Sequence, residues 1–209
     1  MTRLHGLYGL TDAGLMPTDD AMLEQVEAAL RGGMRLLQYR DKSTDGAKRL
    51  RQALALRDLC HRYDCPLLIN DDVKLARASQ ADGVHLGQDD GSVASAREYL
   101  GSKALIGQTC HDSLDLARNA IAAGADHIAF GAFFPSNTKP GASPAPLSLL
   151  QAAKTEFQVP VVAIGGISVD NASQVIEAGA DLVAVVHALF AADDVEQQAH
   201  RFTQQFTTV

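Results

Sequence analysis

One loop of this 209-residue chain gathers several groups that could hold an anion. Residues 130–141 read FGAFFPSNTKPG, so Ser136, Asn137, Thr138 and Lys139 offer hydroxyl, amide and ammonium groups side by side. Such groups bind phosphate oxygens by hydrogen bonds and by charge. Taken alone, Lys139 could serve as a nucleophile, as a phosphate anchor or as a surface charge.

A second cationic set lies in the segment QYRDK, residues 38–42. Arg40 and Lys42 are two residues apart, so they point the same way in an extended segment. Together with Lys139 they could hold a diphosphate, which arginine grips through two hydrogen bonds and lysine as a point charge. The alternative is a solvated strand end, since such charged segments are common.

Carboxylates follow the next two apolar runs. Asp71 and Asp90 could bind Mg²⁺, which prefers oxygen ligands and usually keeps waters and phosphate oxygens in its shell. Helix capping is the other role of aspartate after a strand. From the residues alone both roles stay open for Asp71 and Asp90, whereas we interpret Asp72 and Asp89 as helix caps.

A glycine-rich turn, GGIS at residues 165–168, precedes a predicted helix. Exposed backbone N–H groups in such a turn bind phosphate, and the alternative is a simple tight turn. In (β/α)₈ barrels the phosphate site frequently follows the last two strands, so position favours phosphate binding here.

The elements that must position these groups repeat along the chain. Short runs rich in Val, Ile and Leu do not alternate cleanly with polar residues, which is typical of parallel strands buried on both faces. Between them lie amphipathic helical patterns, such as residues 19–33, 171–181 and 191–206. The eight runs are centred near residues 9, 38, 68, 85, 106, 129, 162 and 184.

Eight strand–helix units predict an α/β fold, a single-domain (β/α)₈ TIM barrel over residues 1–209. The alternative is an open doubly wound sheet, which would need a GxGxxG turn after the first strand, and the chain has LTDAGLMP there. Active sites of barrels lie at the carboxyl ends of the strands. The cationic, acidic and glycine-rich segments all follow runs, so we expect them at one mouth.

Composition narrows the function classes. The net charge of −7 argues against nucleic-acid binding, and no run approaches the length of a membrane span. Cys60, Cys65 and Cys110 lack metal or redox spacing, so we interpret them as reduced thiols. The first residues lack the pattern of a signal peptide. These features predict a cytoplasmic protein with small-molecule partners; a homo-oligomer is compatible with the sequence.

Most of the histidines receive no chemical role. We interpret His5, His61, His127 and His200 as surface or hydrogen-bonded core residues. We expect His85, which lies inside an apolar run, to point into the barrel, and His111 to lie near the mouth.

Seven segments in order along nearly the whole chain resemble the thiamine-phosphate synthase family: LYGLTD, LLQYRDK, LLINDDVKLA, ADGVHLGQDD, FFPSNTKPG, VVAIGGI and GADLVAVV. The resemblance implies a Mg²⁺-dependent transferase, with one ion per active site. It would join a pyrimidine methyl diphosphate to a thiazole phosphate by a dissociative, carbocation-like route. The products would be thiamine phosphate and pyrophosphate.

The resemblance also implies roles for individual residues. Asp71 and Asp90 would bind Mg²⁺, Asn70 would bind the pyrimidine ring, and Arg40, Lys42, Lys139 and Thr109 would take part in catalysis. The implied substrate-binding set is Gln38, Tyr39, Arg40, Asp41, Lys42, Asn70, Thr109, Ser136, Asn137, Thr138, Lys139, Gly166, Val186 and His187.

The chain departs from the family pattern at three positions. Thr109 and His187 stand where the family commonly has serine, and Ser136 opens a loop that usually begins with threonine. Three other functions remain open: a thiazole tautomerase, a Schiff-base aldolase that uses Lys139, and a non-catalytic phosphate-binding relative.

Overall fold

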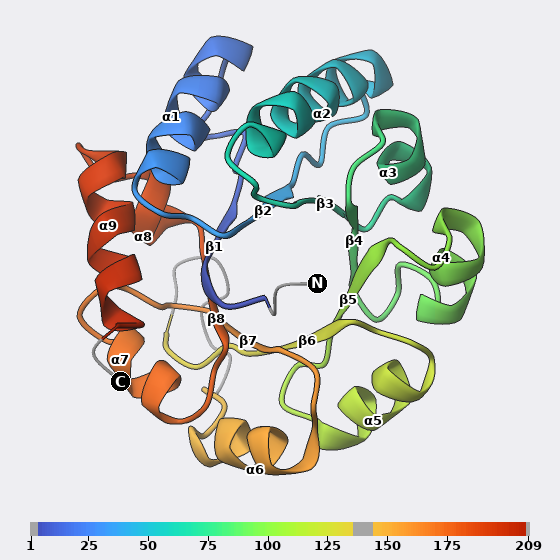
Figure 1. Cartoon of the computed structure of the whole chain (residues 1–209), viewed down its shortest axis with the longest axis vertical. Helices are drawn as coiled ribbons and strands as arrows, with labels where there is room; N and C mark the ends of the chain where they lie inside the picture. Colours follow the sequence, from blue (N-terminus) through green and yellow to red (C-terminus); the bar gives the residue numbers. More distant parts are fainter. Residues whose placement is uncertain (1–3, 136–143, 208–209) are drawn as a thin grey trace.

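In the computed structural model, which describes residues 4–135 and 144–207, eight parallel strands close into one barrel in chain order (Figure 1). Each apolar run named above contains one strand, so the predicted (β/α)₈ barrel is confirmed. The strands are β1 (Gly6–Leu10), β2 (Leu36–Tyr39), β3 (Leu67–Asn70), β4 (Gly83–Leu86), β5 (Leu105–Thr109), β6 (His127–Phe130), β7 (Val161–Ile164) and β8 (Leu182–Val185).

Helices surround the ring of strands (Figure 1). They are α1 (Asp19–Arg31), α2 (Gly46–His61), α3 (Val73–Ser79), α4 (Val93–Leu100), α5 (Leu114–Ala122), α6 (Ser148–Glu156), α7 (Ala172–Glu177), α8 (His187–Phe190) and α9 (Val195–Gln205). Within the described ranges, none of these helices has the length and apolar character that crossing a membrane requires.

The first helix forms as its sequence predicts. The Thr18 hydroxyl accepts a hydrogen bond from the N–H of Ala21 at 3.1 Å, which satisfies one of the free donors of the first turn. Met22, Val26 and Leu30 are buried on one stripe against the barrel. The stripe holds α1 in place because most helix stability in proteins comes from packing of the apolar face.

The aspartates after β3 and β4 differ from the sequence interpretation in one case. Asp72 caps α3, as expected, by accepting from the N–H of Leu75 at 2.9 Å. The cap of α4 is Ser92, whose hydroxyl accepts from the N–H of Ser95 at 3.1 Å. The interpretation of Asp89 as a cap was therefore wrong, because the helix begins three residues further along the chain.

Two apolar layers hold the molecule together. The larger one lies between the outer faces of the strands and the helices, and the smaller one fills the barrel. The smaller layer consists of Tyr8, Leu10, Leu36, Leu68, Ala129, Val162, Leu182 and Ala184. A barrel of eight strands is just wide enough to be filled by side chains, so these residues form a packed interior.

Three aspartates tie strand starts together at the amino-terminal end of the barrel. The carboxylates of Asp82, Asp126 and Asp181 accept the N–H of the first or second residue of β3, β5 and β7, at 2.8, 2.7 and 2.9 Å. The N–H of each aspartate donates to the carbonyl of that same residue. The repeated Ala-Asp pairs of the sequence are thus links between strands.

We predict that Asp126→Ala lowers the free energy of unfolding by ~1–3 kcal/mol. The change leaves the N–H of buried Ile106 without its 2.7 Å acceptor and Arg97 without its 2.5 Å ion pair. Urea denaturation followed by circular dichroism measures the difference. Asp115→Ala, which removes only an exposed ion pair with Arg118, is the control. Equal losses in the two variants would contradict the role of Asp126.

Candidate active site

The carboxyl ends of the strands bring together residues that are far apart in the sequence. The strand register aligns Asn70 of β3 with His85 of β4, His85 with Gly107 of β5, and Gly107 with His127 of β6. Residues just beyond this row, on the carboxyl side, therefore meet at one mouth, as the sequence predicts.

A charged cluster lies at the mouth beyond β2 and β3. Lys42 donates from Nζ to Asp71 Oδ2 at 2.6 Å, and Asn70 donates from Nδ2 to the same oxygen at 2.5 Å. Asp71 has a φ of 63°, which is uncommon for residues other than glycine. This left-handed backbone turns the chain sharply at the end of the strand, and strained backbone of this kind clusters at functional sites.

Asp90 supplies a second carboxylate to the same cluster. Partial burial first, and the neighbouring Asp71 carboxylate second, raise the pKa of Asp90 above its usual range. The N–H of Gly87 donates to Asp90 Oδ2 at 3.1 Å, and a Cβ on Gly87 would lie only 2.4 Å from that oxygen. A side chain at position 87 would therefore displace the Asp90 carboxylate from this position.

The two carboxylates fit a hard divalent cation. They lie close enough for a hydrogen bond, and the Asp71 carboxylate raises the pKa of Asp90; a cation between the two would relieve this repulsion. Among the described residues there is no group of three or more His, Cys, Asp or Glu side chains that could enclose a metal. An ion held here would take its remaining ligands from water and from phosphate, as Mg²⁺ does.

The segment from residue 38 to residue 42 alternates between the two faces of the barrel wall. Gln38 points inward and donates from Nε2 to the Tyr8 hydroxyl at 2.5 Å. Tyr39 points outward and donates its hydroxyl to Gln52 of α2 at 2.7 Å. Beyond β2, Lys42 reaches Asp71 at the mouth, and the backbone N–H of Arg40 donates to the Thr11 hydroxyl at 2.8 Å. That Arg40 and Lys42 share one side stays a prediction.

Asp41 also has its partners outside the barrel. Its carboxylate accepts the ammonium of Lys48 at 2.7 Å and the N–H of Ser43 at 2.6 Å. The structure thus turns the side chains of Tyr39 and Asp41 toward α2, away from the mouth where the resemblance had grouped them with the substrate-binding residues. No hydrogen bond or ion pair occupies the Arg40 guanidinium within the described part of the chain.

Thr109, at the end of β5, is linked to a pair of buried histidines. Its Oγ1 lies 3.0 Å from His85 Nε2, and His85 Nδ1 lies 3.2 Å from His127 Nε2. Burial lowers the pKa of His85 to about 4, and it lowers the pKa of His127 well below its usual range. Both rings are therefore neutral at pH 7, and His85 points into the barrel as predicted.

The far side of the mouth is formed after β7 and β8. Gly166, with a φ of 66°, lies against the loop that follows β6: a Cβ would come within 2.5 Å of the carbonyl oxygens of Phe134 and Pro135. Val186 is half-buried and His187 is exposed at the start of α8. Ser136, Asn137, Thr138 and Lys139 lie outside the described residues.

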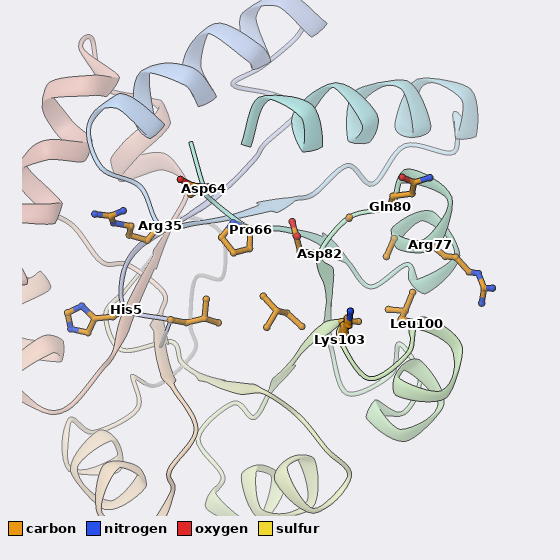
Figure 2. A pocket seen from close by; sticks show the side chains of 14 residues that line it. His5, Arg35, Asp64, Pro66, Arg77, Gln80, Asp82, Leu100 and Lys103 are labelled. Atoms are coloured by element: carbon orange, nitrogen blue, oxygen red, sulfur yellow. The ribbon is translucent and has the colours of Figure 1, made fainter. Parts of the chain in front are cut away.

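A separate cavity of about 920 Å³ lies at the opposite end of the barrel (Figure 2). Residues that precede strands form its wall, including Arg35, Pro66 and Asp82. Active sites of this fold form at the carboxyl ends of the strands. The site residues predicted from the sequence do not line this cavity, so its size does not identify it as the active site.

Sequence reasoning missed the polar network inside the barrel. His127 is a fully buried core residue that bonds His85 through Nε2, in agreement with the second half of its interpretation, but its link to Thr109 was not foreseen. Its Nδ1 has no partner among the described residues. Tyr8, the partner of Gln38, received no role. Strand register is what joins these residues, and a single apolar run with one histidine carries no signal of it.

Comparisons with known proteins agree on one family. The model of the family described as thiamine monophosphate synthase matches residues 7–189. A thiamine-phosphate synthase of Saccharophagus degradans is 55% identical over 195 residues, 93% of this chain and 90% of that protein. One of Alcanivorax borkumensis is 52% identical over 209 residues, 99% of this chain and 96% of that protein.

A solved structure agrees with these relatives. The thiamine phosphate pyrophosphorylase of Pyrococcus furiosus superposes with a TM-score of 0.87 and 32% identity, covering 99% of this chain and 97% of that one. The fold and the sequence therefore point to the same family.

We predict that Asp90→Asn stabilises the metal-free protein at pH 7. The raised pKa of Asp90 means that its charged form is less stable in the folded chain than in the unfolded chain, so stability is lost as the pH rises through that pKa. An exposed charge pair contributes about 1 kcal/mol or less, which bounds the gain. Urea denaturation in EDTA measures it, and the difference from wild type should vanish once the pH falls below the pKa of Asp90.

Asp89→Asn, one residue earlier on the same exposed turn, is the matched control for this substitution. A variant at Asp90 less stable than this control would show that Asp71 and Asp90 do not repel one another.

Proposed function

The chain belongs to the thiamine monophosphate synthase family of transferases, and from this premise we propose how its barrel mouth works. The proposed substrates are 4-amino-2-methyl-5-(diphosphooxymethyl)pyrimidine and 4-methyl-5-(2-phosphooxyethyl)thiazole. The products are thiamine phosphate and pyrophosphate. The observation that carries the proposal is the cluster of Lys42, Asp71 and Asp90 at the ends of neighbouring strands, where it would meet the highly charged diphosphate leaving group.

The proposed reaction is dissociative. The bond between the pyrimidine methylene carbon and the diphosphate oxygen breaks first, and diphosphate leaves with the bonding electrons. The pyrimidine ring stabilises the resulting carbocation until the thiazole nitrogen attacks the methylene carbon. The protein then needs no covalent nucleophile: it must position two substrates and stabilise the departing charge.

In this proposal the cations bind the diphosphate. Lys42 lies at the mouth beside Asp71, and Arg40, two residues earlier, would join it there, since its guanidinium is free of protein partners in the described ranges. Lys139 completes the set from its loop. Charge-assisted hydrogen bonds of this kind strengthen as negative charge develops on the leaving oxygen, so they stabilise the transition state more than the bound substrate.

Asp71 and Asp90 would hold one Mg²⁺, which when bound neutralises diphosphate charge and fixes its oxygens. Hard carboxylate oxygens that repel one another support this assignment. The Asn70 amide, already donating to Asp71, would orient that carboxylate and reach the pyrimidine ring on the other side. Gln38 and Thr109 would line the pyrimidine pocket below the cluster.

The thiazole phosphate would bind across the mouth. Gly166 and Val186 follow the neighbouring strands β7 and β8, where barrels often hold a phosphate. His187, exposed at the start of α8, could donate from its ring in place of the serine hydroxyl. Ser136, Asn137 and Thr138 would close this site from the loop after β6.

The alternatives lack support from a specific observation. A tautomerase on this barrel would not need the diphosphate cations and carboxylates that this chain retains. A Schiff-base aldolase needs a neutral lysine, whereas a lysine beside diphosphate stays charged. We also propose that residues 1–209 form one catalytic domain that works in the cytoplasm; the free, buried thiols of Cys60, Cys65 and Cys110 suit a reducing compartment.

We predict pyrophosphate release that requires both substrates and Mg²⁺, because all three meet at the mouth in this proposal. A coupled assay that detects pyrophosphate measures it. Asp71→Ala and Asp90→Ala should each lower kcat by about 100-fold or more, as loss of a group that stabilises transition-state charge commonly does. Asp89→Ala, on the same turn as Asp90, should leave kcat near that of the wild type.

Tautomerisation of the thiazole without pyrophosphate release would favour the tautomerase. Binding of both substrates without turnover would favour the non-catalytic relative. Full activity of both aspartate variants would contradict the metal site.

We predict that Lys139→Ala slows pyrophosphate release by about 100-fold with little change in the unfolding midpoint, since Lys139 is proposed to stabilise the leaving group. Single-turnover kinetics separate this step from product release. Unchanged turnover would exclude Lys139 from the mechanism. Borohydride trapping of the wild-type protein with a carbonyl substrate, lost in Lys139→Ala, would instead identify Lys139 as a nucleophile.

A further inference from the structure

The barrel interior contains a short chain of hydrogen bonds that ends at the proposed active site. It runs from His127 on β6 to His85 on β4, with 3.2 Å between His127 Nε2 and His85 Nδ1. It continues over 3.0 Å from His85 Nε2 to the Oγ1 of Thr109 on β5. The other nitrogen of the buried His127 ring, Nδ1, has no partner among the residues that the structure describes.

Gly107 makes this contact between the rings possible. It lies on β5 between His85 and His127 in the strand register. A Cβ at this position would come within 2.0 Å of His127 Nε2 and 2.4 Å of His85 Nδ1. The rings thus meet in the space left by a missing side chain, and both histidines are less than a tenth exposed.

If both histidine rings are neutral, the two contacts allow only two arrangements of the ring and hydroxyl protons. In the first, His127 Nε2–H donates to His85 Nδ1, and His85 Nε2–H donates to Thr109, which keeps its own hydroxyl proton for another acceptor. In the second, every donor is reversed: Thr109 gives its proton to His85, and His127 carries its proton on the unpaired Nδ1.

The first arrangement is favoured for two reasons. The second buries an N–H with no acceptor, and orphaned buried N–H groups are rarer in proteins than under-satisfied acceptors. The first also places the proton of both rings on Nε2, the tautomer that free neutral histidine prefers in water. No protein acceptor for the Thr109 hydroxyl proton is found in the described part of the chain.

We propose that His85, held in one tautomer by His127, is a positioning residue that makes the Thr109 hydroxyl a hydrogen-bond donor to the bound pyrimidine diphosphate. The Thr109 oxygen accepts a hydrogen bond from His85 on the core side. The Thr109 O–H therefore points toward the mouth and toward an acceptor atom of the substrate. This inference rests on the proposed function for the identity of the acceptor, but the tautomers are a property of the free protein.

The first test is direct observation of the tautomers. Long-range ¹H–¹⁵N correlation spectra of the wild-type protein carrying ¹⁵N-histidine, recorded without substrate, distinguish protonated from bare ring nitrogens. Signals are assigned by their loss in His85→Gln and His127→Gln. We expect protonated Nε2 and bare Nδ1 on both rings. A protonated Nδ1 on His85, alone or in a charged ring, overturns the proposal.

The second test is a double-mutant cycle on pyrophosphate release. His85→Phe and Thr109→Val should each lower kcat by about tenfold or more, as expected for the loss of one charge-assisted hydrogen bond. Since both changes remove the same interaction, the double variant should be no slower than the slower single variant. Thr109→Ser and His85→Gln, which keep a hydroxyl and an N–H donor, should recover part of the activity.

A merely structural role for His85 would give a different pattern. Additive losses, or full activity of His85→Phe, overturn the proposal. His200→Gln, which changes an exposed histidine of α9, is the control and should match the wild type. If the wild-type protein releases no pyrophosphate, the proposed function fails, and the tautomers in the free protein still decide whether the Thr109 hydroxyl is turned toward the mouth.

Discussion

Closure of eight parallel strands into a barrel is the constraint on which the rest of this molecule depends. Closure removes every sheet edge and leaves an interior that stacked layers of side chains fill. It also brings the carboxyl ends of all eight strands to one mouth, where the polar loops meet. At the opposite end, Asp82, Asp126 and Asp181 each bind the backbone of the preceding strand through two hydrogen bonds. Hydrogen bonds between strands therefore stabilise the amino-terminal end of the barrel, whereas charged side chains gather at the carboxyl end.

The charged residues at the mouth lower the stability of the protein when no ligand is bound. The Asp71 carboxylate raises the pKa of Asp90, and Lys42, which pairs with Asp71, offsets this effect only in part. Asp71 also keeps a left-handed backbone, which a non-glycine residue rarely adopts. Such arrangements are typical of sites that hold a charged ligand, because the ligand supplies the missing opposite charge. Membership of the thiamine monophosphate synthase family agrees with the proposal that a diphosphate and Mg²⁺ occupy this site.

Beneath the mouth, the interior is polar in places where an apolar core would suffice. Gln38 binds Tyr8, and the two histidines connect the core to Thr109. Buried polar groups destabilise a core unless they are paired, so a network with one unpaired nitrogen needs a reason. The orientation of the Thr109 hydroxyl is such a reason. His85 is held rigidly in the core, so it fixes the direction of the Thr109 O–H more precisely than a residue of a solvated loop could.

The sequence by itself determined the eight strands, the amphipathic helices such as α1, and the end of the barrel at which Arg40, Lys42, Asp71 and Asp90 gather. These features depend on local patterns: apolar runs, helical periodicity and the residues that follow each strand. The resemblance of seven segments also identified the family. Only the tertiary structure decided that Tyr39 and Asp41 face α2, that Ser92 and not Asp89 caps α4, and that His85 and His127 meet over Gly107. The physical reason is register: contacts between strands depend on how neighbouring chains align, and a single strand's sequence does not contain that alignment.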